Sequence, residues 1–134
     1  FGGETLSLQA ALATIKYLEK NKVIEKLKKF SYKFQKDLHK MILKYDLQSI
    51  FNIKGVWWRP AFGLKEGISE EYLVILRKNL IKNKLLIGNS FNFCFSHTSP
   101  KIYKEILNKI ENTLKITKKA KVKKINKQIN YVRP

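Results

Sequence analysis

The feature that most constrains the fold of this chain is an apolar repeat between residues 23 and 45. Apolar side chains recur there at steps of three and four positions, at Val23, Leu27, Phe30, Phe34, Leu38, Met41 and Tyr45. Lysines fill the positions between them, at Lys22, Lys26, Lys29, Lys33, Lys36 and Lys40. Because an α-helix turns once in 3.6 residues, this spacing predicts a long helix with one side in a core and a charged side in solvent.

A second helix is predicted before this repeat, over residues 4–20. Glu4, Thr5 and Ser7 supply capping atoms at its start, and Asn21 is a common helix terminator. The small residues Ala10, Ala11 and Ala13 allow two backbones to approach closely, so this helix is expected to pack under another layer. Gly2 and Gly3 precede it, and a glycine turn entering a helix is often used where backbone N–H groups face an anion. The alternative is a tight turn followed by a core helix.

Residues 50–64 change to β-branched and aromatic side chains broken by Gly55 and Pro60, which predicts two short strands or one bent strand. Pro60 is expected at an edge or a bulge because it lacks a backbone donor. Adjacent tryptophans on a strand, Trp57 and Trp58, would face opposite sides. Arg59 beside them is a candidate for binding a substrate carboxylate through a two-pronged hydrogen bond. Alternatively, Arg59 stacks on a tryptophan or pairs with a surface carboxylate.

The second half of the chain predicts two more helices and two more strands. Ser69 is the expected N-cap of a helix that ends near Asn83, and Pro100 suits the first position of a last helix that runs to about residue 118. Residues 85–87 and 91–95 are predicted strands, the second with alternating phenylalanines. The expected fold class is therefore α/β, of the α+β kind, with a short antiparallel sheet of three to four strands covered by helices.

Composition narrows the classes of function. The lone cysteine, Cys94, excludes an internal disulfide, and its apolar surroundings predict a small buried hydrophobe rather than a reactive thiol. Together with the lack of a long apolar stretch or signal segment, it indicates a cytoplasmic protein without a membrane partner. His39 has no second ligand at i+4 to suggest a metal, and His97 is explained by the helix cap Ser96-His97-Thr98-Ser99-Pro100.

The net charge of +18 raises the alternative of a small basic module that binds nucleic acid or an anionic surface. Only three residues, Arg59, Arg77 and Arg133, are arginines, and the lysines are spread over the outer sides of most predicted helices. Base readout favours the arginine fork, so no specific nucleic-acid partner is expected. Residues 119–134 are predicted to be a solvated basic tail.

Several segments of the chain resemble a known family. The run FGGETLSLQAALATIKYL, the segment GNSFNFCFSHT and the last amphipathic helix are similar to the C-terminal part of class III pyridoxal-phosphate-dependent aminotransferases. The likeness is strongest to the branch around glutamate-1-semialdehyde aminomutase and spans roughly residues 1–118. It implies the C-terminal portion of a fold-type I enzyme. Residues 1–20 would end the cofactor-binding domain and form a connecting helix, and residues 21–118 would form the small domain.

The resemblance also implies a cofactor and a reaction. Phe1, Gly2 and Gly3 would border a loop that holds the phosphate of pyridoxal 5'-phosphate across a homodimer contact. The family's Schiff-base lysine lies further upstream, so the resemblance assigns no catalytic residue here and implies a fragment that is inactive alone. The whole enzyme would transfer an amino group on an amino acid or semialdehyde, with a small-molecule amino donor or acceptor as partner.

Overall fold

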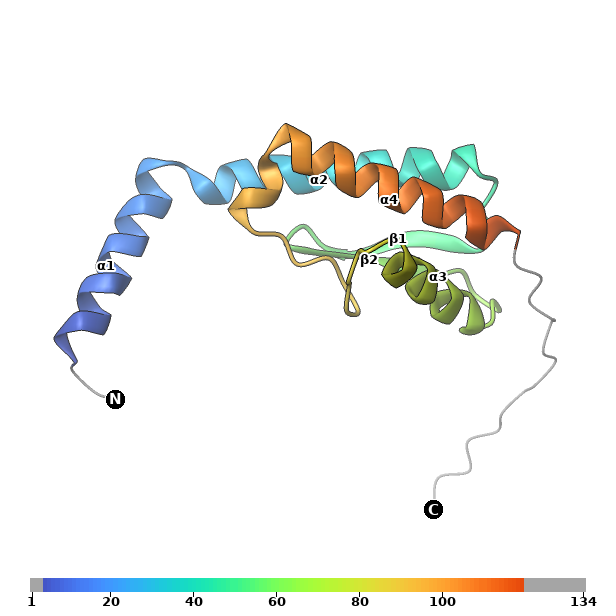
Figure 1. Cartoon of the computed structure of the whole chain (residues 1–134), viewed down its shortest axis with the longest axis horizontal. Coiled ribbons are helices and arrows are strands. Elements are labelled where there is room, and N and C mark those ends of the chain that lie inside the picture. The colour runs from blue at the N-terminus through green and yellow to red at the C-terminus, as the bar shows by residue number, and fades with distance from the viewer. Residues whose placement is uncertain (1–3, 120–134) are drawn as a thin grey trace, which may run out of the picture.

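The computed structural model describes residues 4–119, which form four helices and a two-stranded antiparallel sheet (Figure 1). In chain order the elements are α1 (Thr5–Lys20), α2 (Val23–Lys44), β1 (Phe51–Val56), β2 (Arg59–Leu64), α3 (Glu71–Lys82), the 3-10 turn η1 (Phe95–Thr98) and α4 (Pro100–Lys118). The prediction of a mixed α/β fold is confirmed. No helix in this part of the chain is long and apolar enough to cross a membrane.

The four helices lie where the sequence predicts them. α4 begins at Pro100, and the backbone N–H of Glu71 donates to the Ser69 hydroxyl, 3.3 Å away, at the start of α3. Between α1 and α2 the chain bends at Lys22, which has a left-handed φ of 48°. The N-cap of α3 is Glu70, one residue after the predicted Ser69, and no α-helix in residues 4–119 has a side-chain hydrogen bond at its N-cap. The sequence nevertheless predicted the helix boundaries to within a residue or two.

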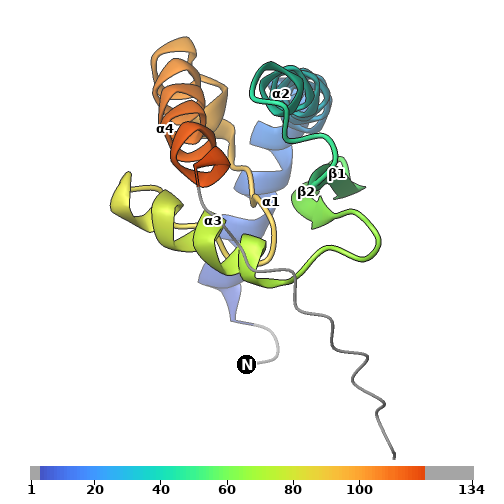
Figure 2. The ribbon, with the colours of Figure 1, turned by 90° about the vertical axis from the view of Figure 1, so that its right-hand side faces the viewer.

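Two layers enclose the core. In Figure 2, α2 and α4 lie along one layer, while the β1–β2 hairpin lies beneath α2 and α3 lies beneath α4. The core contains apolar side chains from all of these elements and from the loops between them: Phe34, Leu38, Ile42, Leu47, Phe51, Phe62, Leu76, Leu80, Phe91, Ile110 and Leu114. The repeat predicted for α2 thus supplies one wall of the core.

The hairpin corrects the prediction for the two tryptophans. β1 pairs with β2 from Phe51 opposite Leu64 to Val56 opposite Arg59, so Trp57 and Trp58 form the turn and do not lie on a strand. Their rings meet edge to face with centroids 5.5 Å apart, and the Ser31 hydroxyl donates to the Trp57 carbonyl oxygen. The turn is therefore tied to α2, while the Trp58 side chain stays exposed.

The predicted strands at residues 85–87 and 91–95 do not form, so the described residues contain two strands and not three to four. A single backbone hydrogen bond, from the Phe91 N–H to the Pro60 carbonyl oxygen at 2.8 Å, joins the second segment to the edge of β2. The alternation of phenylalanines has another cause. Phe91 and Phe93 each pack edge to face against Phe34 with ring centroids 4.9 Å apart, which buries Phe91 and partly buries Phe93 without a strand ladder.

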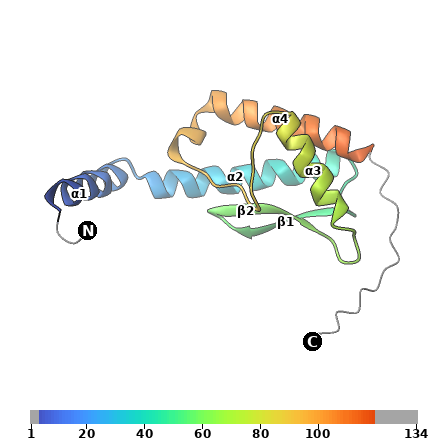
Figure 3. The same ribbon diagram turned by 60° about the horizontal axis from the view of Figure 1, so that its bottom comes forward.

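Helix α1 corrects a second expectation. None of its residues is buried by the rest of residues 4–119, although the alanines predicted a covered helix. Figures 1 and 3 show α1 projecting away from the two layers, joined to them only at the start of α2. The side chains of Leu6, Leu8, Ile15 and Tyr17 are all more than half exposed. A partner for α1 must therefore lie outside residues 4–119 if these side chains are to be buried.

Two similar polar clusters join α2 to α4. In the first, the Lys33 Nζ donates to the Asp37 carboxylate at 2.8 Å and the Tyr103 hydroxyl donates to the same oxygen. In the second, Lys44 and the Tyr45 hydroxyl both donate to Glu111 Oε1, at 2.7 and 2.8 Å. Each cluster satisfies a partly buried carboxylate with a cation and a phenol, which fixes how α4 lies along α2.

The first cluster predicts a pH-dependent contribution to stability. Partial burial alone would raise the pKa of Asp37, but the hydrogen bonds from Lys33 and Tyr103 outweigh it and lower that pKa. A carboxylate with a lowered pKa stabilises the folded state above its unfolded pKa, and the stabilisation disappears as the pH falls below about 4. Asp37→Asn is expected to lower the free energy of unfolding by about 1 kcal/mol at pH 7 and by much less at pH 3.

Urea unfolding at both pH values measures this difference. Asp46→Asn is the matched control, because the Asp46 carboxylate pairs with Lys118 on the surface with 73% of its side chain exposed. Exposed pairs of this kind contribute little, so the control should change stability by less than about 0.5 kcal/mol. Equal losses in the two variants would contradict the role given to Asp37.

Gly55 is required by the hairpin. Its φ is +94°, and a Cβ there would lie 2.4 Å from the Arg59 carbonyl oxygen. Both the backbone conformation and the close approach exclude a side chain. Gly55→Ala is expected to lower the free energy of unfolding by about 2 kcal/mol in a urea titration. Gly88→Ala is the control, since a Cβ at Gly88 meets nothing within 4 Å; a comparable loss there would refute the explanation.

Candidate functional site

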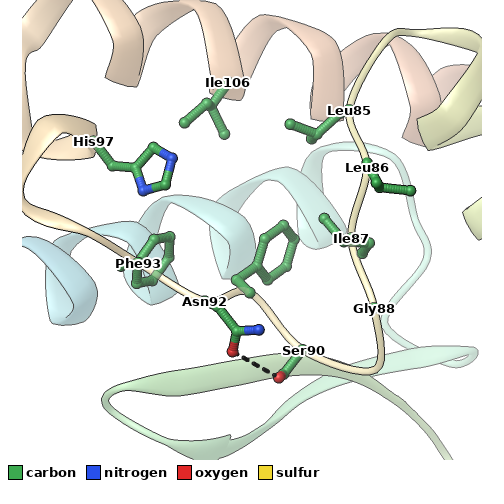
Figure 4. Close-up of a pocket in the computed structure, with 10 residues that line it drawn as sticks. Leu85, Leu86, Ile87, Gly88, Ser90, Asn92, Phe93, His97 and Ile106 are labelled. Atoms are coloured by element: carbon green, nitrogen blue, oxygen red, sulfur yellow. Dashed lines mark hydrogen bonds between the residues drawn. The ribbon is translucent and has the colours of Figure 1, made fainter.

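The segment between α3 and α4 borders a small cavity of about 140 Å³ between the layers (Figure 4). Ile87, Phe93 and Ile106 are among its apolar walls, and Ser90, Asn92 and His97 supply polar groups. Figure 4 shows Ser90 and Asn92 next to each other on the loop, where the Ser90 hydroxyl donates to Asn92 Oδ1 at 3.4 Å. Its lining therefore mixes apolar side chains with hydrogen-bonding groups from the loop and from His97.

Arg59, the substrate-binding candidate from the sequence, lies at this loop. It is the first residue of β2, its side chain is exposed, and its Nε donates to the Ser90 hydroxyl at 3.3 Å. It neither stacks on a tryptophan nor pairs with a carboxylate within residues 4–119. Its neighbour is a serine that lines the cavity, and carboxylate binding by Arg59 stays a prediction.

Arg77 reaches the same loop from a different element. It lies on the second turn of α3, and its Nη2 donates to Asn89 Oδ1 at 3.0 Å. Sequence reasoning missed this residue, because nothing in the spacing of residues 77 and 89 predicts that they meet. A weak signal was present, since arginine is rare in this chain and lysine occupies nearly every other basic position.

The environment of Cys94 corrects its predicted burial. Cys94 is exposed, with its Sγ 3.0 Å from the Ser96 hydroxyl and 3.3 Å from His97 Nδ1. The Cys94 backbone N–H donates to the same His97 nitrogen at 3.0 Å, so His97 closes the η1 turn as a capping residue. The hydrogen bond with Ser96 lowers the pKa of the Cys94 thiol, against an opposing effect of partial burial.

A lowered pKa predicts a more reactive thiol, because the thiolate is the nucleophile. Ser96→Ala is expected to slow alkylation of Cys94 by iodoacetamide at pH 7 by about two- to fivefold, measured by mass spectrometry over time. Ser99→Ala is the control, because the Ser99 side chain makes no capping hydrogen bond at the start of α4. The explanation fails if both variants react at the wild-type rate.

The predicted cofactor residues Phe1, Gly2 and Gly3 lie outside the described residues, as does the basic tail from residue 120 onward. Within residues 4–119, every lysine is exposed except the half-buried Lys109, which pairs with Glu105 at 2.7 Å. A lysine that forms a Schiff base needs a desolvated environment that lowers its pKa. None of the described lysines fits covalent attachment of pyridoxal phosphate, and no described residue is assigned to hold it.

No group of three or more histidine, cysteine or acidic side chains in residues 4–119 is arranged to hold a metal ion. His39 is exposed on the outer side of α2, as predicted. Candidate ligand-binding groups in the described part of the chain include the two arginines, the polar loop and the cavity beside it.

Comparisons of the chain with protein-family models, with curated proteins and with solved structures found no match.

Proposed function

We propose that this chain is the C-terminal part of a longer pyridoxal-phosphate-dependent enzyme, an aminotransferase or aminomutase of fold type I, that works as a homodimer. The proposal combines the sequence resemblance with one structural observation, the uncovered apolar surface of α1. In such an enzyme the cofactor acts as the electron sink for amino-group transfer, and the protein binds and positions it. Residues 21–118 would supply the small domain beside the substrate entrance.

The apolar side chains of α1 lie on two opposite faces. Leu8 and Ile15 are seven positions apart and therefore lie within about 20° of each other around the helix, and the same holds for Leu6 and Tyr17 at eleven positions. The two pairs are about 160–200° apart. Their exposed fractions run from 53% at Ile15 to 75% at Leu6. A helix with apolar side chains on both faces is suited to lie between two layers of protein.

Covering both faces of α1 with protein would be energetically favourable. An isolated 16-residue helix is marginal in water, so most helical stability must come from packing. Each large apolar side chain contributes about 1.5–3 kcal/mol when it is fully buried, and α1 leaves at least four of them uncovered. Burial of both faces would therefore stabilise α1 by several kcal/mol.

The charge of α1 also suits a protein partner. Residues 4–20 contain two lysines and two glutamates, in a chain whose net charge is +18. The centres of protein interfaces are depleted in charge, and a neutral helix avoids the repulsion that lysine-rich surfaces would cause. The proposed enzyme offers two candidates for the two faces, namely its own upstream domain and the second subunit. Because Gly2 and Gly3 directly precede α1, the same arrangement would bring the glycine turn near the subunit contact.

The full-length protein provides the test. It is expected to be a dimer in light scattering and to show the visible absorbance band of bound pyridoxal phosphate, with amino transfer from an amino acid as the activity. The 134-residue chain alone should show no such band. A full-length protein that binds no cofactor would refute the proposal, and so would covalent attachment of the cofactor to a lysine of residues 4–119.

Variants of α1 in the full-length protein test the structural argument separately. Leu6→Glu and Leu8→Glu each place a charge on one apolar face, so both are expected to weaken dimerisation or cofactor retention at least tenfold. Gln9→Glu is the matched control, because Gln9 lies on a polar strip between the two faces. Wild-type behaviour of both leucine variants would show that α1 is not covered.

The alternative is a small basic module that binds nucleic acid or an anionic surface. Only the net charge of +18 supports it. Nucleic acid titrated at two salt concentrations separates the two functions. Binding that persists at high salt with a base preference would favour the alternative, whereas weak binding that salt removes would reflect only the lysine charge.

A further inference from the structure

We infer that the outer edge of β1 is a contact surface between two copies of this chain. The two β1 strands pair antiparallel across this contact, so that two hairpins form one four-stranded sheet. Both copies use the same edge, and the contact therefore closes on itself as a two-fold dimer. Neither α1 nor a cofactor takes part in it, so this contact goes beyond the proposed function.

Strand β1 has one edge without a partner. Within residues 4–119 the sheet contains only β1 and β2. Figure 2 shows β1 on the side of the hairpin that faces away from α3 and α4. The outer edge of β2 is partly covered, because the Pro60 carbonyl oxygen accepts the Phe91 N–H. The edge of β1 is therefore the open edge of this sheet, and an open edge is a template for another strand.

The ladder determines which backbone groups of β1 point outward. The Lys65 N–H donates to the Ile50 carbonyl oxygen at 2.9 Å, so these two residues form a hydrogen-bonded pair at the end of the hairpin. Hydrogen-bonded and non-hydrogen-bonded pairs alternate along antiparallel strands, so Ile53 and Phe62 form a non-hydrogen-bonded pair. The N–H and the carbonyl oxygen of Ile53 therefore point away from β2. Neither group forms another backbone hydrogen bond within residues 4–119.

Charge selects the register of the two strands. A two-fold axis at Ile53 lets this residue exchange both backbone hydrogen bonds with Ile53 of the second copy. The same axis sets Lys54 opposite the neutral Asn52 of the second copy, and it brings together two Ile53 side chains that are only partly buried in one chain. Moving the axis to Lys54 would instead place two lysines directly opposite each other, where like charges repel. Charge complementarity therefore favours the axis at Ile53.

The side of α2 above this edge also suits a second copy. Gln35 Nε2 donates to the Ser31 hydroxyl at 3.4 Å, and that hydroxyl donates to the Trp57 carbonyl oxygen, so Gln35 lies on the side of α2 nearest the hairpin. His39, one turn further along, shares this side. Lys28 lies two turns earlier, toward the hairpin turn and away from the two-fold axis. The two α2 helices therefore meet near the axis through an amide and an imidazole and not through lysines.

The size of the contact predicts a weak dimer. Each β1 contributes only six residues, whereas a stable specific interface buries at least about 1,000 Å². Tyr32 is 55% exposed and lies 60° around α2 from Gln35, so its ring adds apolar area beside the strands. We expect a dissociation constant of about 50 µM for the dimer.

The 134-residue chain without cofactor is the material for the test. Sedimentation equilibrium is expected to show a dimer that forms between 10 µM and 1 mM, around the dissociation constant of about 50 µM. Amide hydrogen exchange followed by NMR locates the contact. The Ile53 amide hydrogen should exchange about threefold more slowly at 1 mM than at 50 µM, because its N–H gains a partner only in the dimer. The neighbouring Lys54 amide, which donates within the hairpin, should exchange at the same rate at both concentrations.

Two pairs of variants test the backbone contact and the register. Ile53→Pro removes the outward N–H without removing a hydrogen bond of the hairpin, and it is expected to weaken the dimer at least tenfold. Ile53→Ala is its matched control, because it loses the side chain and keeps the N–H; it should weaken the dimer less than threefold. Asn52→Lys sets lysines opposite each other twice per dimer and should weaken it about five- to tenfold. Asn108→Lys adds the same charge at an exposed position of α4 and should leave the dissociation constant within twofold of wild type.

Three outcomes would overturn the inference. One is a wild-type chain that stays monomeric up to 1 mM, as it would if residues 120–134 covered the edge of β1. Another is a dimer that Ile53→Pro and Ile53→Ala weaken equally. The third is a dimer that Leu8→Glu abolishes and Ile53→Pro leaves intact, since α1 would then be the contact. Urea unfolding of each variant distinguishes a loss of pairing from a loss of fold. Because no cofactor and no upstream chain is present, failure here is distinguishable from failure of the proposed function.

Discussion

The burial of one side of α2 is the constraint on which the rest of this structure depends. Phe34, Leu38 and Ile42 form a continuous apolar surface that is almost wholly removed from solvent by the hairpin, α3, α4 and the loop before α4. Several aromatic side chains meet around Phe34, so the loop of residues 88–95 is positioned by ring packing more than by backbone hydrogen bonds. The polar clusters of Asp37 and Glu111 then set how α4 lies along α2.

The packing of these elements determines where the candidate site lies. Arg59 is carried on the hairpin beneath α2 and Arg77 on the helix beneath α4, and the loop between them closes over the remaining gap. Because separate elements carry its residues, the geometry of such a site is only as well defined as the core that holds these elements in place. The two arginines in residues 4–119 reach this loop from different elements, whereas the lysines lie mostly on the outer surface.

Helix α1 differs from the other helices because its apolar side chains have no counterpart within residues 4–119. Its composition resembles that of a core helix, yet its surroundings are solvent. The same physical rule that assembles α2, α3 and α4 would favour a further layer of protein over α1. The proposal of a longer dimeric enzyme is one way to supply it.

The sequence by itself determined the four helices, the hairpin region and the apolar side of α2, because capping residues and 3.6-residue periodicity act locally. It also singled out Arg59. Only the tertiary structure decided that residues 91–95 pack as a loop, that Cys94 is exposed beside Ser96 and His97, and that Arg77 meets the loop carrying Ser90. Alternating phenylalanines fit a strand and a loop against an aromatic core equally well. The surrounding side chains therefore decided which of the two structures residues 91–95 adopt. Contacts between residues far apart in the chain depend on how whole elements pack, which no local pattern contains.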